Sequence, residues 1–203
     1  MGRDTGPRNK LSRREGVDLF GNGGESLQRR LDQPPGMHGR GDLRRRQRVG
    51  DYARQLREKQ KVKRIYGMRE RQFRRFYEIA QQASDLTGTA LLQLLERRLD
   101  NIVYRMGWAR TRPQARQMVT HGHVLVDGRR VNIPSYLVDP EQRVALAEKI
   151  QRTPDVQELI ETHTGVPEWL QREAAQGTVL RIPQREEIQE PVDEQLVVEF
   201  YSR

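Results

Sequence analysis

The chain has 203 residues, only 34% of them hydrophobic, and a formal net charge of +9, so it can build one large or two small domains with modest cores. The absence of cysteine excludes disulfides, thiol nucleophiles and cysteine-based zinc sites. No apolar run approaches the roughly 20 residues of a membrane-spanning helix, and the first ten residues lack the apolar centre of a signal peptide, so we expect a cytoplasmic protein.

Positive charge is concentrated at the beginning of the chain. Residues 1–80 carry 22 Lys and Arg against 10 Asp and Glu, residues 81–150 carry 10 against 7, and residues 151–203 carry 5 against 11. Such a distribution is typical of a protein that binds a polyanion, because each neutralised phosphate releases condensed counterions. The basic segments have few large apolar residues on their opposite faces, which favours nucleic acid over a membrane surface.

The first 50 residues lack the regular spacing of apolar side chains that indicates a helix or a strand. Gly and Pro clusters interrupt this segment, and none is followed by the Gly-Lys-Ser/Thr of a phosphate-binding loop. We expect residues 1–45 to be extended chain that becomes ordered against a partner.

Two basic helices are predicted next. The first runs from about Asp51 to Gly67 and carries positive charge over most of its surface. The second covers residues 69–83 and keeps its arginines outside a buried stripe of Phe73, Phe76, Tyr77 and Ala80. We expect these aromatic rings in the core, because base stacking would need them exposed.

The central stretch is predicted to contain two further helices and a hairpin. Apolar residues at spacings of three and four predict one helix over residues 91–106, which Gly107 ends. Thr111 and Gln114 have the spacing of a capping box around Pro113, so a second helix begins there and ends at Gly122. Residues 124–131 then predict a β-hairpin on a type I′ turn at Asp127-Gly128.

Arginine is concentrated in this stretch, and residues 101–126 contain no Asp or Glu. Arg112 and Arg116 lie four residues apart and Arg110 precedes the capping residue, so their guanidinium groups are expected to converge at the N-terminal end of the second helix. That end attracts anions through its free N–H groups, and planar guanidinium groups suit phosphate oxygens. An ordinary solvated helix face is the alternative explanation.

The last third of the chain is acidic and shows weaker patterns. It predicts a strand around Val144, short helices over residues 155–164 and 167–175, and a strand over residues 179–182. The final ten residues fit either a strand or a helix, and the acidic first turn at Asp193 and Glu194 favours a helix.

The sequence offers little for catalysis. Of the four histidines only His121 and His123 lie close together, and they have no third ligand at the spacing of a metal site. These two are expected to donate hydrogen bonds to phosphate or to the helix end. No Ser or Asp fits a catalytic triad or a carboxylate pair, so we expect no enzyme, no metal and no cofactor.

The stretch from Arg98 to Tyr136, RLDNIVYRMGWARTRPQARQMVTHGHVLVDGRRVNIPSY, closely resembles the S4-type RNA-binding module. The flanks agree: PPGMHG at residues 34–39, YARQLREKQKVKRIYGMRERQFRRFYEIA at residues 52–80, and EQLVVEFYSR at the C-terminus. Over nearly the whole chain the sequence therefore resembles the bacterial-type small ribosomal subunit protein S4 (uS4) family.

The resemblance implies an α+β fold, in which an S4-type α/β module of two helices packed on a small antiparallel sheet is inserted into a helical first domain. Residues 1–45 would be extended and ordered by RNA. Residues 46–86, completed by residues 183–203, would form the helical domain, and residues 87–182 the second domain, with the module at about residues 95–160. Some relatives bind a metal through N-terminal cysteines; the corresponding positions here are Asn9, Ser12 and Ser26, with Leu31 nearby, which implies no metal.

By the same resemblance, this is a structural ribosomal protein that binds 16S rRNA directly, nucleates early small-subunit assembly and contributes to decoding accuracy. Its expected neighbours are small-subunit proteins such as S5 and S3, and in some bacteria its own mRNA. We expect RNA contacts from the residues Arg44, Arg45, Arg46, Lys59, Lys61, Lys63, Arg64, Arg69, Arg71, Arg74, Arg75, Arg97, Arg98, Arg110, Arg112, Arg116, His121 and Arg130.

An RNA-targeting module of an RNA-modifying enzyme is the alternative function. Arg98-Leu99-Asp100 resembles the tripeptide around the catalytic aspartate of pseudouridine synthases. Here, however, that tripeptide falls inside an amphipathic helix, and no segment is large enough to form a separate catalytic domain.

Overall fold

The computed structural model describes residues 6–21, 23–36, 50–83 and 86–202. The chain forms two compact units, of which unit 1 comprises residues 1–78 and 191–203 and unit 2 comprises residues 79–190. The domain boundary that the sequence places near residue 45 lies outside the described residues. Among the described residues, none of the helices combines the length and apolar character needed to cross a membrane.

Unit 1 begins with two short helices, α1 (Arg8–Glu15) and α2 (Glu25–Gln28). The prediction of extended chain is therefore wrong for these residues. Gly16, at φ 70°, ends α1 with a hydrogen bond from its N–H to the Ser12 carbonyl. The buried Ser12 hydroxyl accepts a hydrogen bond of 3.3 Å from the Leu19 N–H. These contacts between residues close in sequence stabilise α1. The helix has little apolar periodicity, so the sequence pattern did not predict it.

The two predicted basic helices are confirmed as α3 (Asp51–Ile65) and α4 (Glu70–Gln81). Gly67 follows α3 at φ 59°, where a residue without Cβ is at no disadvantage. The stripe predicted on α4 is buried, with exposed fractions of 6% or less for Phe73, Phe76, Tyr77 and Ala80. The rings are therefore core residues of unit 1.

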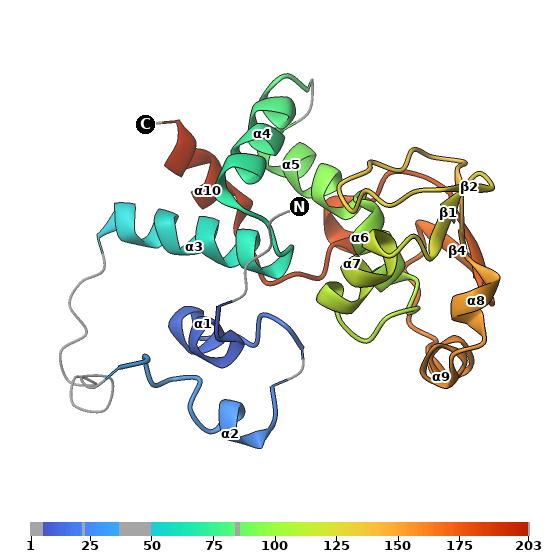
Figure 1. Cartoon of the computed structure of the whole chain (residues 1–203). Coiled ribbons are helices and arrows are strands. Elements are labelled where there is room, and N and C mark those ends of the chain that lie inside the picture. Colours follow the sequence, from blue (N-terminus) through green and yellow to red (C-terminus); the bar gives the residue numbers. More distant parts are fainter. Residues whose placement is uncertain (1–5, 22, 37–49, 84–85, 203) are drawn as a thin grey trace. The chain divides into compact units, whose positions relative to one another are not determined.

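The C-terminal residues form a helix, α10 (Glu194–Tyr201), as the acidic first turn predicted. The Asp193 carboxylate caps it by accepting hydrogen bonds from the N–H groups of Gln195 and Leu196. In Figure 1, α10 (red) lies against α3 (cyan), and the Tyr201 ring stacks on Tyr77 of α4 with ring centroids 4.6 Å apart. The end of the chain thus completes the helical unit that α3 and α4 begin.

Unit 2 opens with two helices, α5 (Thr87–Glu96) and α6 (Leu99–Arg105), where the sequence predicted one. The single-helix prediction is wrong because Arg98 adopts an extended conformation, φ −64° and ψ 136°, and forms a β-bridge with Leu137. The first N–H groups of α6, from Leu99 and Asp100, donate to the carbonyls of Tyr136 and Pro134. The free N–H groups at the start of α6 thus find hydrogen-bond acceptors far away in sequence. The spacing of apolar residues cannot predict such partners.

The second central helix and the hairpin are confirmed as α7 (Arg112–Thr120), β1 (Val124–Val126) and β2 (Arg129–Arg130). Asp127 and Gly128 have φ values of 48° and 75°, which is the sign pattern of a type I′ turn. The strands pair with Val126 opposite Arg129 and Leu125 opposite Arg130.

The remaining elements are β3 (Arg143–Leu146), α8 (Glu148–Gln151), α9 (Pro154–Thr162), β4 (Leu170–Glu173), β5 (Gln176–Val179) and the 3₁₀ helix η2 (Arg185–Glu187). The predicted strand around Val144 is confirmed as β3, and the predicted helix over residues 155–164 is confirmed as α9. The hairpin belongs to an antiparallel sheet of five strands in the order β2-β1-β3-β5-β4.

Two predictions for this region are wrong. Residues 170–173 form a strand instead of a helix, because a turn at Ala174, with φ 51°, folds the chain back into a hairpin that pairs Leu170 with Val179. The following strand lies at residues 176–179 and not at 179–182. Leu180 and Ile182, whose apolar side chains suggested the later position, are exposed.

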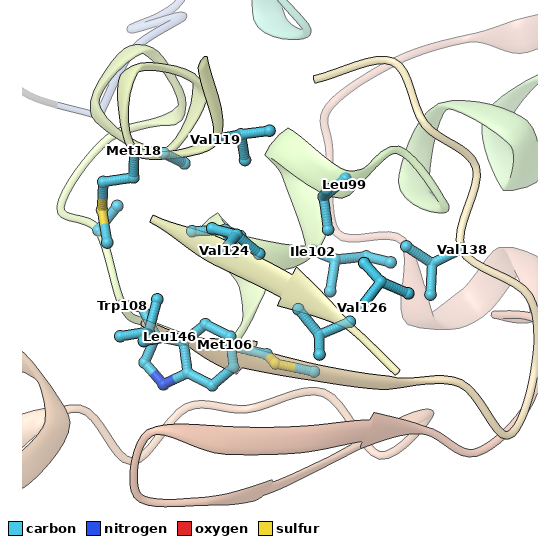
Figure 2. Packing of buried hydrophobic residues seen from close by; sticks show 14 of the residues in the cluster. Leu99, Ile102, Met106, Trp108, Met118, Val119, Val124, Val126, Val138 and Leu146 are labelled. Atoms are coloured by element: carbon cyan, nitrogen blue, oxygen red, sulfur yellow. The ribbon is translucent and has the colours of Figure 1, made fainter. Parts of the chain in front are cut away.

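The core of unit 2 lies between the helices and the sheet. Figure 2 shows Leu99 and Ile102 of α6, Met118 and Val119 of α7, and Val124 and Val126 of β1 gathered around one apolar space. Trp108 is fully buried there, and its indole N–H donates to the Ala174 carbonyl at 2.9 Å. Helices packed on a small antiparallel sheet confirm the predicted α+β class, and this packing holds α6, α7 and the hairpin in fixed relation.

Candidate nucleic-acid interface

The N-terminal end of α7 is capped as the sequence predicted. The Gln114 N–H donates to the Thr111 hydroxyl at 3.4 Å, and the Gln114 side chain accepts a hydrogen bond of 2.9 Å from the Arg110 N–H. Pro113 occupies the first turn, where its missing N–H is no loss. The Gln114 side chain thus bonds to Arg110 and not to the capping residue, so only the Thr111 half of the predicted capping box forms. The two hydrogen bonds fix the backbone from which Arg110 and Arg112 project.

Arg112 lies in a cluster of polar side chains beside this helix end. Its Nε donates to Asn101 Oδ1 at 2.9 Å, its Nη2 donates to Glu190 Oε1 at 2.5 Å, and its guanidinium lies 4.5 Å from the centroid of the Tyr104 ring. Arg105 contacts the same Glu190 oxygen at 3.1 Å. Two of the arginines in the acid-free stretch therefore converge, but on a carboxylate that lies 78 residues away from Arg112 in sequence.

Arg98 and Arg116 are buried and pair with Asp100. The Arg98 guanidinium donates two hydrogen bonds to the Asp100 carboxylate, at 3.0 and 2.7 Å, and Arg116 Nη1 donates a third at 3.1 Å. Arg98 is 0% exposed and Arg116 is 8% exposed. This ion-paired group ties the start of α6 to α7, so we assign these two arginines to holding the scaffold rather than to phosphate contact.

The hairpin carries two exposed cations. Arg129 and Arg130 are exposed and form no ion pair with a described residue. Arg130 shares the face of Leu125 and Ala145, while Arg129 shares the face of Val126, since opposed residues in an antiparallel pair point the same way. Arg129 was not among the residues predicted to contact RNA, although its place directly after the turn could have indicated it.

Two histidines lie near Arg130. The rings of His121 and His123 lie 6.1 Å apart, and the Arg130 side chain packs over Gly122 between them. Burial, followed by the nearby positive charges of His121, Lys149 and Arg130, lowers the pKa of His123 below its usual 6.5. Lys149 and Arg143 are exposed cations that the prediction also missed, because neither adjoins a motif in the sequence.

Two other predicted arginines of unit 2 are engaged with acids. Arg110 forms an exposed ion pair with Glu158 at 2.9 Å, a kind of contact that contributes little to stability and that a phosphate can replace. Arg97 is mostly buried, pairs with Asp139 and donates a hydrogen bond of 3.1 Å to the Val138 carbonyl.

In unit 1 the predicted residues divide into paired and accessible cations. Lys59 and Lys63 both contact Glu70, at 2.8 and 3.0 Å, and line a hollow of about 640 Å³ that Arg74, Phe200 and Tyr201 share. Lys61 pairs with Glu58, Arg64 with Glu15, and Arg74 with Glu78. The accessible residues without an ion pair to any described residue are Arg69, Arg71 and Arg75. Arg44, Arg45 and Arg46 lie outside the described residues.

The arrangement offers an anion-binding surface rather than a reaction centre. In the described ranges, no three His, Asp or Glu side chains come together as metal ligands would. Asp100, the aspartate that resembles the catalytic residue of pseudouridine synthases, is only 7% exposed at its side chain and engaged by two arginines. A base inserted beside it would first have to break this buried ion pair.

Comparison with known proteins matches the whole chain. Residues 3–96 match the model of the ribosomal protein S4/S9 N-terminal domain, and residues 97–144 match the model of the S4 domain. Proteins named small ribosomal subunit protein uS4 from Herpetosiphon aurantiacus and Dictyoglomus turgidum are each 52% identical, and one from Geobacillus thermodenitrificans is 50% identical. In all three alignments 100% of both chains is covered.

Proposed function

The chain belongs to the small ribosomal subunit protein uS4 family, and from this membership we propose that it binds 16S rRNA directly through the exposed cations of its two units. It is a structural, non-enzymatic protein of the small ribosomal subunit, and this excludes the alternative of an RNA-modifying enzyme. The positions of the exposed cations support the direct contact with rRNA.

The presentation of Arg129 and Arg130 is the observation that carries the proposal. Both stand on a strand of two residues, exposed and without an ion pair to a described residue, and the Arg130 side chain lies over Gly122, beside His121 at the C-terminal end of α7. In the same unit, the buried group of Asp100, Arg98 and Arg116 keeps α6 and α7 together. Guanidinium groups on a rigid support can follow the spacing of phosphates on folded RNA without first losing conformational entropy.

Unit 1 supplies a second basic surface. Arg69, Arg71 and Arg75 are exposed on and just before α4, and the hollow beside them holds the ammonium groups of Lys59 and Lys63 against one carboxylate, Glu70. Contacts of this kind position an RNA through its backbone and carry no base information. We therefore propose recognition of RNA shape by two basic surfaces, with Lys61, Arg64, Arg97 and Arg110 contributing only after their ion pairs open.

Further roles follow from family membership as parts of the same proposal. The protein would bind early in small-subunit assembly, contribute to decoding accuracy beside S5 and S3, and act in the cytoplasm as part of the ribosome. Binding to its own mRNA would use the same cations, because phosphate contacts do not distinguish one folded RNA from another.

Hydroxyl-radical footprinting of the purified chain on a 16S rRNA transcript tests the proposal. We expect protected nucleotides at a folded junction, and loss of only a part of the protection when Arg129 and Arg130 are both changed to Gln. A charge-matched double variant of Arg152 and Arg181, both exposed in unit 2, serves as the control and should leave the footprint intact. A chain that leaves the transcript unprotected at low ionic strength, or that does not sediment with small subunits, would refute it.

A further inference from the structure

The polar cluster beside the N-terminal end of α7 contains two arginines and two glutamates. Arg105 donates to both oxygens of Glu96 at 2.8 Å, and both Arg105 and Arg112 reach the same oxygen of Glu190, at 3.1 and 2.5 Å. The two positive and two negative charges balance. Half-buried guanidinium groups need such partners, because an uncompensated charge in a poorly solvated place is costly.

The two glutamates differ in accessibility. The Glu96 side chain is 1% exposed and also accepts a hydrogen bond from Asn101 Nδ2 at 2.8 Å, so it is a fixed part of the core. The Glu190 side chain is 15% exposed and belongs to residues 188–190, which form neither a helix nor a strand. Of the two carboxylates, Glu190 is therefore the one that can leave the arginines without unfolding a helix.

Space for an incoming group lies next to the cluster. A cavity of about 650 Å³ is lined by Tyr104, Arg105 and Arg110, and also by Gln189, the neighbour of Glu190. Its acidic lining residues are Glu168, Glu186 and Glu187, and Glu187 is already paired with Arg181 at 2.6 Å. A group that entered here would meet Arg105 directly and Arg112 once Glu190 had moved.

We propose that Glu190 is an internal substitute for phosphate, which occupies an anion site made by Arg105 and Arg112 until a phosphodiester of bound RNA displaces it. Loss of one carboxylate and gain of one phosphodiester leaves the charge of the cluster unchanged, so the exchange needs no further counterion. The bound carboxylate keeps the arginines paired in the free protein and lowers RNA affinity by the fraction of molecules in which the site is occupied. This inference rests on the proposed rRNA binding and adds to it one defined phosphate contact, for which a carboxylate of the protein itself competes.

Glu190→Gln tests the exchange, because the amide keeps the shape of the side chain and removes its charge. The matched control is Glu141→Gln, which removes the same charge from an exposed residue of unit 2 that does not line this cavity and forms no ion pair with a described residue. In Glu190→Gln we expect inorganic phosphate, at constant ionic strength, to raise Tm, whereas the wild type and the control show no such rise. For an rRNA transcript, the log-log salt dependence should steepen by about one unit, at roughly 0.7 to 0.9 per added contact.

The two measurements separate the possible failures. If no variant binds the transcript but Glu190→Gln responds to phosphate, the anion site exists and the rRNA function fails. If Glu190→Gln binds the transcript with the wild-type slope and ignores phosphate, the exchange is refuted and rRNA binding stands. Should the variant not fold, the Nε–H resonances of Arg105 and Arg112 in the wild type decide: they shift on addition of the transcript if Glu190 is displaced, and unchanged resonances overturn the inference.

Discussion

The Tyr201 hydroxyl donates a hydrogen bond of 2.8 Å to Glu70 Oε1, so the last turn of α10 is bound to the first turn of α4. Lys59 and Lys63 of α3 donate to the same carboxylate at 2.8 and 3.0 Å. One acidic side chain thus joins α3, α4 and α10. The Lys59 ammonium also lies 4.6 Å from the centroid of the Phe200 ring, which keeps this buried cation near a second favourable group.

This carboxylate should make unit 1 sensitive to acid. Burial alone would raise the pKa of Glu70, but the hydrogen bonds from Lys59, Lys63 and Tyr201 outweigh it and lower that pKa from 4.5 to about 2. A lowered folded-state pKa gives stability that is present above 4.5 and is lost as the pH falls towards 2. Urea unfolding of Glu70→Gln should therefore show less stability than the wild type at pH 7 and a smaller difference at pH 2.5. Glu78→Gln, which removes only the exposed partner of Arg74, is the control, and a constant difference across this range would contradict the assignment.

The buried ion pairs of Asp100 predict a large loss of stability on substitution. Asp100→Ala leaves the guanidinium groups of Arg98 and Arg116 without the carboxylate that both contact, and breaking a buried pair costs about 3–5 kcal/mol. Asp139→Ala, which removes the 66% exposed partner of Arg97, should cost less than about 1 kcal/mol. Equal midpoints in urea for these two variants would show that the buried group does not hold α6 to α7.

How far the sequence predicted this structure depends on whether the deciding contacts were local. The cap at Thr111, the turn at Asp127-Gly128 and the stripe on α4 involve residues within a few positions of one another, and all three are confirmed. The break at Arg98 depends on Leu137, and the strand at Leu170 depends on Val179, so neither can be read from nearby spacing.

The same limit applies to the site. A count of arginines cannot show that Asp100 or Glu190 neutralises some of them, because Glu190 lies far away in sequence from Arg112. The pattern predicted that guanidinium groups would gather near α7, and it missed that two of the predicted residues, Arg98 and Arg116, are buried there. Family resemblance predicted the class of function. Only the three-dimensional structure shows which arginines are buried in ion pairs and which are accessible.

The hairpin turn requires a residue at position 128 that tolerates a positive φ. The Gly128 φ of 75° lies in the left-handed region, where a β-branched residue is strained, while open space surrounds the position of an added Cβ. Gly128→Val should therefore destabilise the hairpin by about 1–2 kcal/mol through the backbone alone. Gly128→Asn, a residue that tolerates this conformation, should lose clearly less. Limited proteolysis between β1 and β2 measures the effect, and equal resistance of the two variants would exclude a strained turn.

Loss of the hairpin arginines should change the salt dependence of RNA binding, whereas loss of Arg116 should change the stability of the fold. Arg129→Gln with Arg130→Gln removes two accessible cations, so the slope of log K against log salt for an rRNA transcript should fall by roughly 1.5 units, at about 0.7 to 0.9 per contact, with the free energy of unfolding unchanged. Arg116→Gln removes a buried partner of Asp100, so it should lower the free energy of unfolding. The protein that remains folded should bind the transcript with an unchanged slope of log K against log salt. Filter binding from 50 to 300 mM KCl and urea unfolding of the same preparations give both quantities. A lower slope for Arg116→Gln at full folding would mean that this arginine leaves Asp100 to reach phosphate.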